Sequence, residues 1–200
     1  MTKKIPVLLL VALLAASVLW CSGLQLYDVG DSLFCIYLGA AVPDFIWFPA
    51  DNSGDTNFLA FSDTHLRTGL NAAISYQVFI SPSLALGGEV AYQFCYSRSD
   101  MIQTAIPITA NLSWFFKQST RLDIIGGIGA GITFAKYDGN LYLAPTLTLT
   151  VEPVVYFSEH WGFGLGAGFT AMAELYFADK TSDTALAAFS PVRLSVHYRR

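Results

Sequence analysis

The segment of residues 121–136 reads RLDIIGGIGAGITFAK, and its pattern decides the fold. It is apolar enough for a buried core, yet it carries glycine at positions 126, 127, 129 and 131, and glycine weakens helices and strands alike. A phosphate-binding loop would explain the glycines, but their order does not fit a dinucleotide fingerprint, and neither a Lys-Ser/Thr pair nor a helical pattern follows. Even positions are instead mostly large and apolar while odd positions are mostly small or polar, which is typical of a β-strand with two different faces.

The same two faces recur in seven more segments, at about 33–43, 67–80, 83–97, 102–117, 143–157, 161–177 and 190–199. Most are near the 9–11 tilted residues that cross a bilayer, or longer, and well above the roughly 5–6 of an average strand. Short connections, at 80–84, 116–120 and 158–161, alternate with longer ones, at 44–66, 97–101, 137–142 and 178–188. This alternation is typical of membrane barrels. The sequence therefore predicts an all-β fold, an eight-stranded antiparallel up-and-down transmembrane β-barrel over residues 33–200.

A barrel of eight strands has an interior just wide enough for side chains to fill it. Glycines on the small face of residues 121–136, and those within 162–168, would leave room there for larger inward groups from other strands. We therefore expect these glycines to be a packing feature of the lumen.

The N-terminus has the order of a secretory signal. MTKK is a basic start, IPVLLLVALLAASVLW is a long apolar run, and CSG supplies small residues. We expect a cleaved signal at residues 1–23, a periplasmic tail at 24–32 and the barrel after it; a membrane anchor and, because of Cys21, a lipoprotein are the alternatives. The chain is 54% hydrophobic and 13% charged without a basic patch, which argues against an ordinary soluble domain and against nucleic acid as a partner.

With this signal, these segments, their alternating connections and the last strand PVRLSVHYRR, the sequence resembles the small eight-stranded bacterial outer-membrane proteins of the OmpW, OmpX and OmpA-barrel kind. The resemblance covers residues 31–200 and rests on architecture rather than on a sharp motif. It implies a bacterial outer-membrane location, with outer-membrane lipid and the barrel-assembly machinery as partners, and we expect a monomer. Such proteins usually end on an aromatic residue, whereas here Arg199 and Arg200 follow Tyr198.

Charged residues are few on the inward faces, and five of them form a candidate lumen network: Arg67, Glu89, Glu152, Glu174 and Arg193. Counting along the strands places Glu89, Glu152 and Arg193 near mid-height, and Arg67 with Glu174 near the long connections. Buried charges must pair or stay hydrated. The network can be a structural ion-pair plug or a gate for protons and small ions, and the plug is the commoner case.

The long connection at 44–66 carries an aromatic cluster, with Phe45, Trp47, Phe48, Phe58 and Phe61. Exposed apolar clusters mark interaction sites or a folded cap, and aromatic residues also line the membrane interface. One interpretation is a site for a small hydrophobic solute, as the resemblance to OmpW-type barrels implies. The other is an extension of the flanking strands beyond the bilayer.

No motif indicates catalysis, a cofactor or a metal site. His65, His160 and His197 lack the spacing of metal ligands, and SDTH at 62–65 holds catalytic residue types by composition alone. Cys35 begins one strand and Cys95 ends another. We expect them at opposite heights, beyond the roughly 4.4–6.8 Å between Cα atoms that a disulfide needs.

These patterns together predict a non-enzymatic integral outer-membrane barrel that handles small solutes, hydrophobic ones included, with little or no open pore. The first alternative is an adhesin or structural protein that binds a host ligand through its outer loops. The second is a soluble lipocalin-like carrier, whose oily face would point inward.

Overall fold

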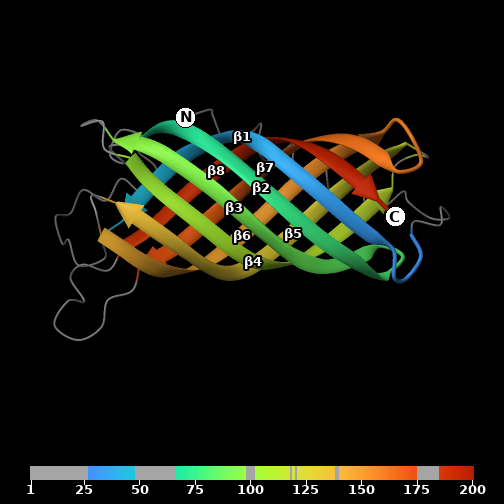
Figure 1. Ribbon diagram of the computed structural model, residues 1–200, viewed down its shortest axis with the longest axis horizontal. Coiled ribbons are helices and arrows are strands. Elements are labelled where there is room, and N and C mark those ends of the chain that lie inside the picture. Colours follow the sequence, from blue (N-terminus) through green and yellow to red (C-terminus); the bar gives the residue numbers. More distant parts are fainter. Residues whose placement is uncertain are drawn as a thin grey trace, which may run out of the picture.

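The computed structural model describes residues 27–47, 66–97, 102–117, 119, 121–137, 140–174 and 185–200. The strands are β1 (Ser32–Trp47), β2 (Leu66–Ser81), β3 (Leu84–Ser97), β4 (Ile102–Lys117), β5 (Leu122–Tyr137), β6 (Asn140–Tyr156), β7 (Trp161–Glu174) and β8 (Ala185–Arg199). Each strand pairs with the next in antiparallel fashion, and β8 closes the barrel against β1 (Figure 1). The predicted eight-stranded antiparallel barrel is confirmed. The described part of the chain holds no helix long and apolar enough to cross a membrane.

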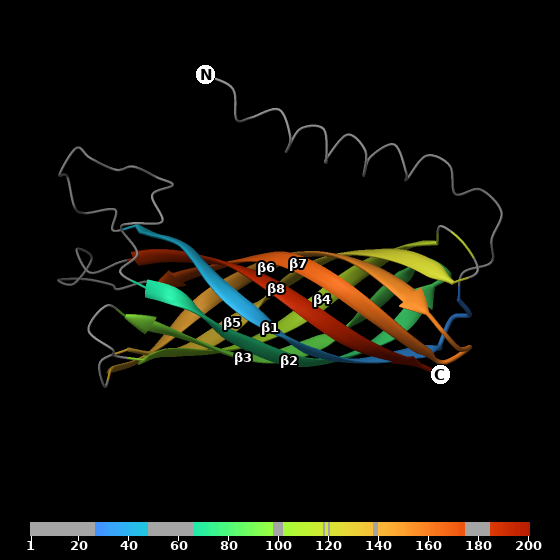
Figure 2. The same cartoon turned by 90° about the horizontal axis from the view of Figure 1, so that it is seen from above.

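The barrel has two different ends. Connections 82–83, 118–121 and 157–160 lie at one of them, which we call the turn end; connections 48–65, 98–101, 138–139 and 175–184 join strands at the other, the loop end. Both ends of the described chain are at the turn end (Figure 2), where Ser32 N donates to Arg200 O at 2.9 Å. An even number of strands requires this placement.

Three strands extend three or more residues beyond their predicted bounds. β1 runs to Trp47, so the predicted connection at 44–66 begins only at residue 48. Asn140 of β6 pairs with Tyr137 of β5, and only two residues join these strands where a longer loop was predicted. Those two are Asp138 and Gly139, the kind of pair that favours the shortest hairpins. β8 begins at Ala185 rather than at 190, because its first residues pair with β7 and with the end of β1.

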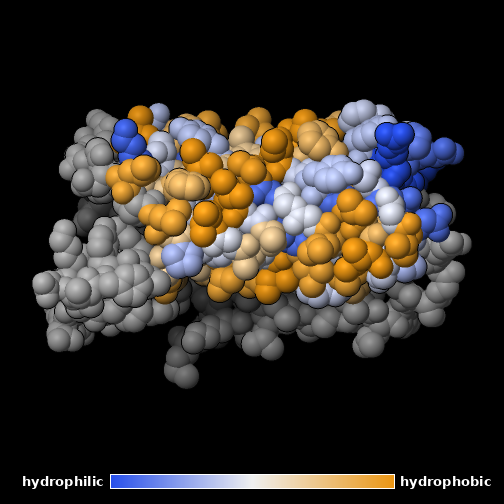
Figure 3. All heavy atoms as spheres, turned by 60° about the horizontal axis from the view of Figure 1, so that its bottom comes forward, coloured by the Kyte–Doolittle hydropathy of each residue, from blue (hydrophilic) through white to orange (hydrophobic). Residues whose placement is uncertain are grey.

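Side chains alternate between the exterior and the lumen along the strands. Leu38, Leu165 and Leu194 point outward with 62%, 56% and 66% of their surface exposed. Apolar residues cover much of the visible wall, and hydrophilic residues gather at one end (Figure 3). Such a large exposed apolar surface belongs in lipid. The lipocalin-like alternative is therefore wrong, since it needs the oily face inside.

The lumen is filled in three layers. The turn-end cluster is apolar and rich in aromatic rings: Tyr27, Leu33, Cys35, Tyr37, Ala73, Phe79, Ala85, Ala91, Phe115, Ile125, Val154 and Tyr156. The loop-end cluster is apolar and mostly small: Ala41, Cys95, Ala105, Ala135, Ala144, Met172 and Phe189. Between them the buried side chains are mainly polar, such as Asn71, Thr109 and Thr133.

The inward glycines leave the space that polar side chains fill. A methyl group on Gly129 of β5 would overlap Asn111 Oδ1 and Thr148 Oγ1. A methyl group on Gly164 of β7 would overlap Glu152 Oε1 and Ser195 Oγ. Glycine on these two strands thus makes room for larger inward side chains of their neighbours, as the narrow eight-strand lumen predicted.

Candidate functional site: the filled lumen

An ion pair crosses the middle of the lumen. Arg193 of β8 reaches past β1 and β2 to Glu89 of β3, with Arg193 Nη1 lying 2.7 Å from Glu89 Oε1. The guanidinium also lies over the ring of Tyr37, 4.3 Å from its centroid, a favourable cation–π geometry. The two charged side chains keep only 7% and 14% of their surface exposed. Removing either partner would leave a buried, uncompensated charge.

A second polar group lies toward the turn end. Glu152 of β6 accepts a hydrogen bond from Ser195 Oγ, and its Oε1 lies 3.1 Å from His197 Nε2. The other ring nitrogen, His197 Nδ1, lies 3.1 Å from Cys35 Sγ. The sequence placed Glu152 beside Arg193, but its hydrogen bonds go to Ser195 and His197. Arg193 and His197 are both odd-numbered residues of β8, so both side chains point into the lumen. This alternation was the sequence signal that could have placed His197 in the polar group.

A small cavity separates these two groups. It has a volume of about 20 Å³, and its lining includes Glu89, Arg193, Glu152, His197, Gln77 and Asn111. A single water needs about 10–15 Å³, so the cavity has room for one or two. Gln77 Oε1 and Asn111 Oδ1 are buried and have no protein hydrogen-bond partner, which suits a hydrated site. The middle of the lumen is thus a polar plug with a water-sized space.

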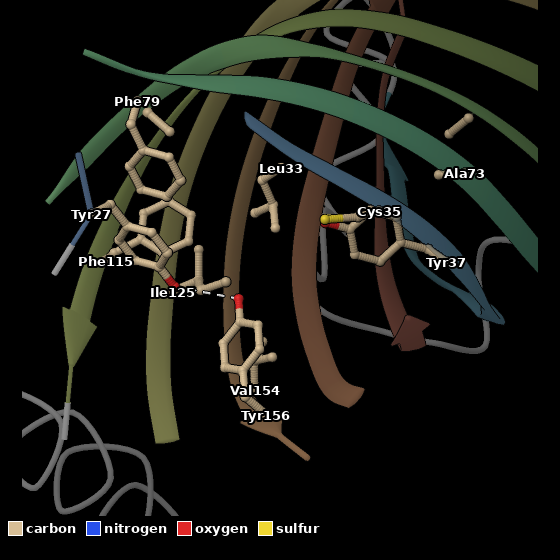
Figure 4. Packing of buried hydrophobic residues seen from close by; sticks show 12 residues of the cluster. Tyr27, Leu33, Cys35, Tyr37, Ala73, Phe79, Phe115, Ile125, Val154 and Tyr156 are labelled. Atoms are coloured by element: carbon tan, nitrogen blue, oxygen red, sulfur yellow. Dashed lines mark hydrogen bonds between the residues drawn. The ribbon is translucent and has the colours of Figure 1, made fainter. Parts of the chain in front are cut away.

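The turn end is sealed by a residue that precedes the barrel strands. The Tyr27 ring stacks on Phe79 with centroids 4.0 Å apart and meets Phe115 edge-on at 5.3 Å (Figure 4). Its hydroxyl donates to Asp123 and lies 3.4 Å from Tyr156 Oη. Burial, followed by the nearby Tyr156 and Asp123, raises the pKa of Tyr27, so the hydroxyl remains protonated and continues to donate. Tyr27, which belongs to the predicted periplasmic tail, therefore closes the turn end of the lumen.

A tight turn aims Tyr27 into the barrel. Asp31 N donates to Asp28 O at 3.1 Å, and Asp31 Oδ2 accepts from Asp28 N at 3.1 Å. Gly30 has a φ of 99°, in the left-handed region that glycine adopts without strain. Gly30 N then donates to Phe79 O at 2.9 Å, which anchors the turn to the end of β2.

The other predicted site residues lie apart from this plug or outside the described residues. Arg67 is exposed near the start of β2, where a register shift between Arg67 and Leu70 interrupts the ladder with β3. Glu174 ends β7, and its side chain lies outside the described part. Phe45 is half-buried on β1, not in a loop, because β1 is longer than predicted. The side chain of Trp47, and the whole of Phe48, Phe58 and Phe61, lie outside the described residues.

The described residues include no group of three or more His, Cys, Asp and Glu side chains arranged to hold a metal ion. Cys35 and Cys95 are both free and buried. They belong to the turn-end and loop-end clusters respectively.

Comparisons with known proteins agree with this architecture. A protein-family model matches residues 21–198. No curated protein sequence matches the chain. The crystal structure of Neisserial surface protein A is 10% identical, with a TM-score of 0.58 over 84% of this chain and 96% of that one. The outer membrane protein OprG from Pseudomonas aeruginosa is 11% identical, with a TM-score of 0.53 over 89% of this chain and 99% of that one. Together with the apolar exterior, these likenesses confirm the predicted outer-membrane β-barrel.

Proposed function

We propose that this chain, which belongs to the family whose model matches residues 21–198, is a non-enzymatic outer-membrane barrel that handles small apolar solutes without an open aqueous pore. The solute enters the loop-end cluster and leaves sideways into the lipid. Passage along the barrel axis is closed by the plug and by the seal at Tyr27.

The filled middle of the lumen supports the absence of a pore. Glu89 and Arg193 meet across the lumen at 2.7 Å, and the adjoining cavity holds about 20 Å³. An eight-strand barrel can be filled by its own side chains, whereas open channels need about sixteen strands. Hydrated ions therefore have no continuous path through the described barrel.

The proposed sideways route rests on the way β1 pairs with its neighbours at the loop end. The ladder between β1 and β2 ends at Ala41 and Gly69, whereas the ladder between β1 and β8 continues to Trp47. Beyond Ala41, β1 is thus held by one neighbour among the described strands. This stretch also contains Pro43, which cannot donate to a ladder, and a register shift between Pro43 and Phe45. A seam with fewer hydrogen bonds opens at a lower cost than the rest of the wall.

The loop-end cluster lies beside that seam and suits an apolar solute. Its members are apolar, and most are alanines. Small side chains can be displaced with little loss of packing, and an apolar guest replaces the contacts that they give up.

A reversible cross-link tests the sideways route. Val42→Cys with Thr68→Cys places a disulfide at the next outward positions beyond the end of the β1–β2 ladder. The matched control is Ile36→Cys with Ile74→Cys, a directly paired outward position in the intact part of the same ladder. The assay is transfer of an apolar fluorescent probe into liposomes that contain the barrel.

We expect oxidation of the 42–68 pair to slow probe transfer, reduction to restore it, and the control pair to have no effect. Planar-bilayer recording should show no large, steady conductance. A large conductance, or a transfer rate that does not change when the 42–68 pair is cross-linked, would show that the proposed solute route is wrong. Transfer no faster than in protein-free liposomes would favour a loop-binding function instead.

A further inference from the structure

Three side chains from three strands meet in the turn-end half of the lumen: Cys35 of β1, Glu152 of β6 and His197 of β8. Cys35 Sγ lies 3.1 Å from His197 Nδ1, and Glu152 Oε1 lies 3.1 Å from His197 Nε2. A carboxylate only accepts hydrogen bonds, so Glu152 favours the imidazole tautomer that carries its proton on Nε2 and turns the Nδ1 lone pair toward the thiol. Nε2 also lies 2.9 Å from Ser195 Oγ. A nucleophile, a base and an orienting carboxylate stand in the same order in thiol enzymes.

The surroundings of this group are polar. Ser195 Oγ donates to the same oxygen of Glu152. The mid-lumen cavity of about 20 Å³ is lined by His197 and Glu152. On the other side of the thiol, Ser75 is the cross-strand partner of Cys35; its Oγ is buried and has no protein hydrogen-bond partner. A neutral molecule with one or two oxygen atoms fits the cavity and meets hydrogen-bonding groups there, Glu152 and His197 among them, and His197 in turn contacts the thiol.

The second cysteine provides a built-in comparison. Cys95 is as well buried as Cys35, with 2% against 0% exposed. Its Sγ faces a backbone carbonyl, Ala41 O, at 3.8 Å, and its cluster is apolar. A thiol in apolar surroundings is inert, whereas a thiol beside a base forms the reactive thiolate. The two thiols are therefore equally buried, and they differ in that only Cys35 lies beside a base.

We propose that Cys35 is a modification site whose thiol is activated by His197 toward small neutral oxidants of the hydrogen peroxide class. His197 Nδ1 takes the thiol proton, and the thiolate sulfur attacks one peroxide oxygen. The O–O bond breaks, and the leaving hydroxide takes the proton from His197 and becomes water. Sulfur loses two electrons and becomes a sulfenic acid, while the peroxide is reduced. The proposal is independent of the solute route.

The experiment compares both thiols in one sample. The folded barrel in detergent micelles is exposed to hydrogen peroxide for increasing times, and catalase stops the reaction. The protein is then unfolded, the remaining thiols are alkylated, and peptide-resolved mass spectrometry gives the rate of loss at each cysteine. We expect Cys35 to react about 10²-fold faster than Cys95, the lower end of what a positioned base contributes.

The variant His197→Gln distinguishes loss of the base from a general loosening of the barrel. If His197 acts as the base, this variant slows Cys35 to near the rate of Cys95 and leaves Cys95 unchanged. If the substitution only loosens the fold, both thiols react faster, and that result would overturn the proposal. Equal rates at the two cysteines in the unmodified protein would overturn it as well. A large reagent, such as a maleimide carrying a dye, should label neither thiol in the folded barrel.

Discussion

The two ends of the lumen are filled in different ways. The loop-end cluster consists mostly of alanines, with Met172 and Phe189 as its large members. At the turn end, Tyr27 stacks on Phe79, and its hydroxyl donates to Asp123. Stacked rings and hydrogen bonds fix one arrangement, whereas small apolar side chains tolerate several. We therefore expect substitutions in the polar middle and at the turn end to cost more than comparable ones at the loop end.

We expect the largest loss of stability at the ion pair in the middle of the lumen, between the turn-end and loop-end clusters. Arg193→Ala leaves the Glu89 carboxylate buried and unpaired, which should lower the free energy of unfolding by about 3–5 kcal/mol. Urea unfolding in detergent micelles, followed by tryptophan fluorescence, measures it. Adding Glu89→Leu to that variant removes the orphaned charge and should recover much of the loss. A single variant as stable as the parent would mean that the ion pair does not hold the middle of the lumen.

Tyr27→Ala should have the next largest effect. It removes the ring that packs on both Phe79 and Phe115, and it should cost about 2–3 kcal/mol, below a typical buried Phe→Ala because a terminal segment relaxes easily. Tyr27→Phe keeps the ring and loses only the hydrogen bonds, at about 1 kcal/mol. Val29→Ala is the matched control on the same segment, since Val29 is 69% exposed. Equal effects at Tyr27 and Val29 would argue against a seal at this end.

Gly164→Ala tests whether this glycine leaves the space that the Glu152 and Ser195 side chains occupy. The added methyl would overlap Glu152 Oε1 and Ser195 Oγ, and overpacking of this kind costs about 1–3 kcal/mol. Gly126→Ala is the control, because its methyl would meet Phe116 at an ordinary 3.7 Å. We expect that control to be neutral or slightly stabilising, since glycine is a poor strand residue. A thermal unfolding series that ranks the two variants in the opposite order would contradict the packing role of the inward glycines.

The smallest effect is expected at the loop end. Met172→Leu conserves volume within the loop-end cluster, and it should cost less than about 1.5 kcal/mol. The same unfolding measurement applies. A cost larger than that of Gly164→Ala would show that the loop-end cluster is as tightly specified as the polar middle, and the contrast between the two ends would fail.

The period-two pattern of residues 121–136 and of its seven repeats was enough to predict the barrel. Side chains on a strand alternate by geometry, so the pattern alone assigns each residue to lipid or lumen. It placed Glu89 and Arg193 at one height, and they form an ion pair. It also indicated that the inward glycines make room in a narrow lumen, because eight strands set the width.

The tertiary structure decided which inward groups touch. Glu152 bonds to Ser195 and His197, and Cys35 meets His197 because β8 closes against β1 in a particular register. Register and shear depend on all eight ladders together and are not encoded in any one strand. Tyr27 lies before the first strand and carries no periodic signal, so only the folded chain shows that it seals the barrel. Alternation is a local property of the backbone, whereas contacts across a lumen follow from closure of the whole sheet.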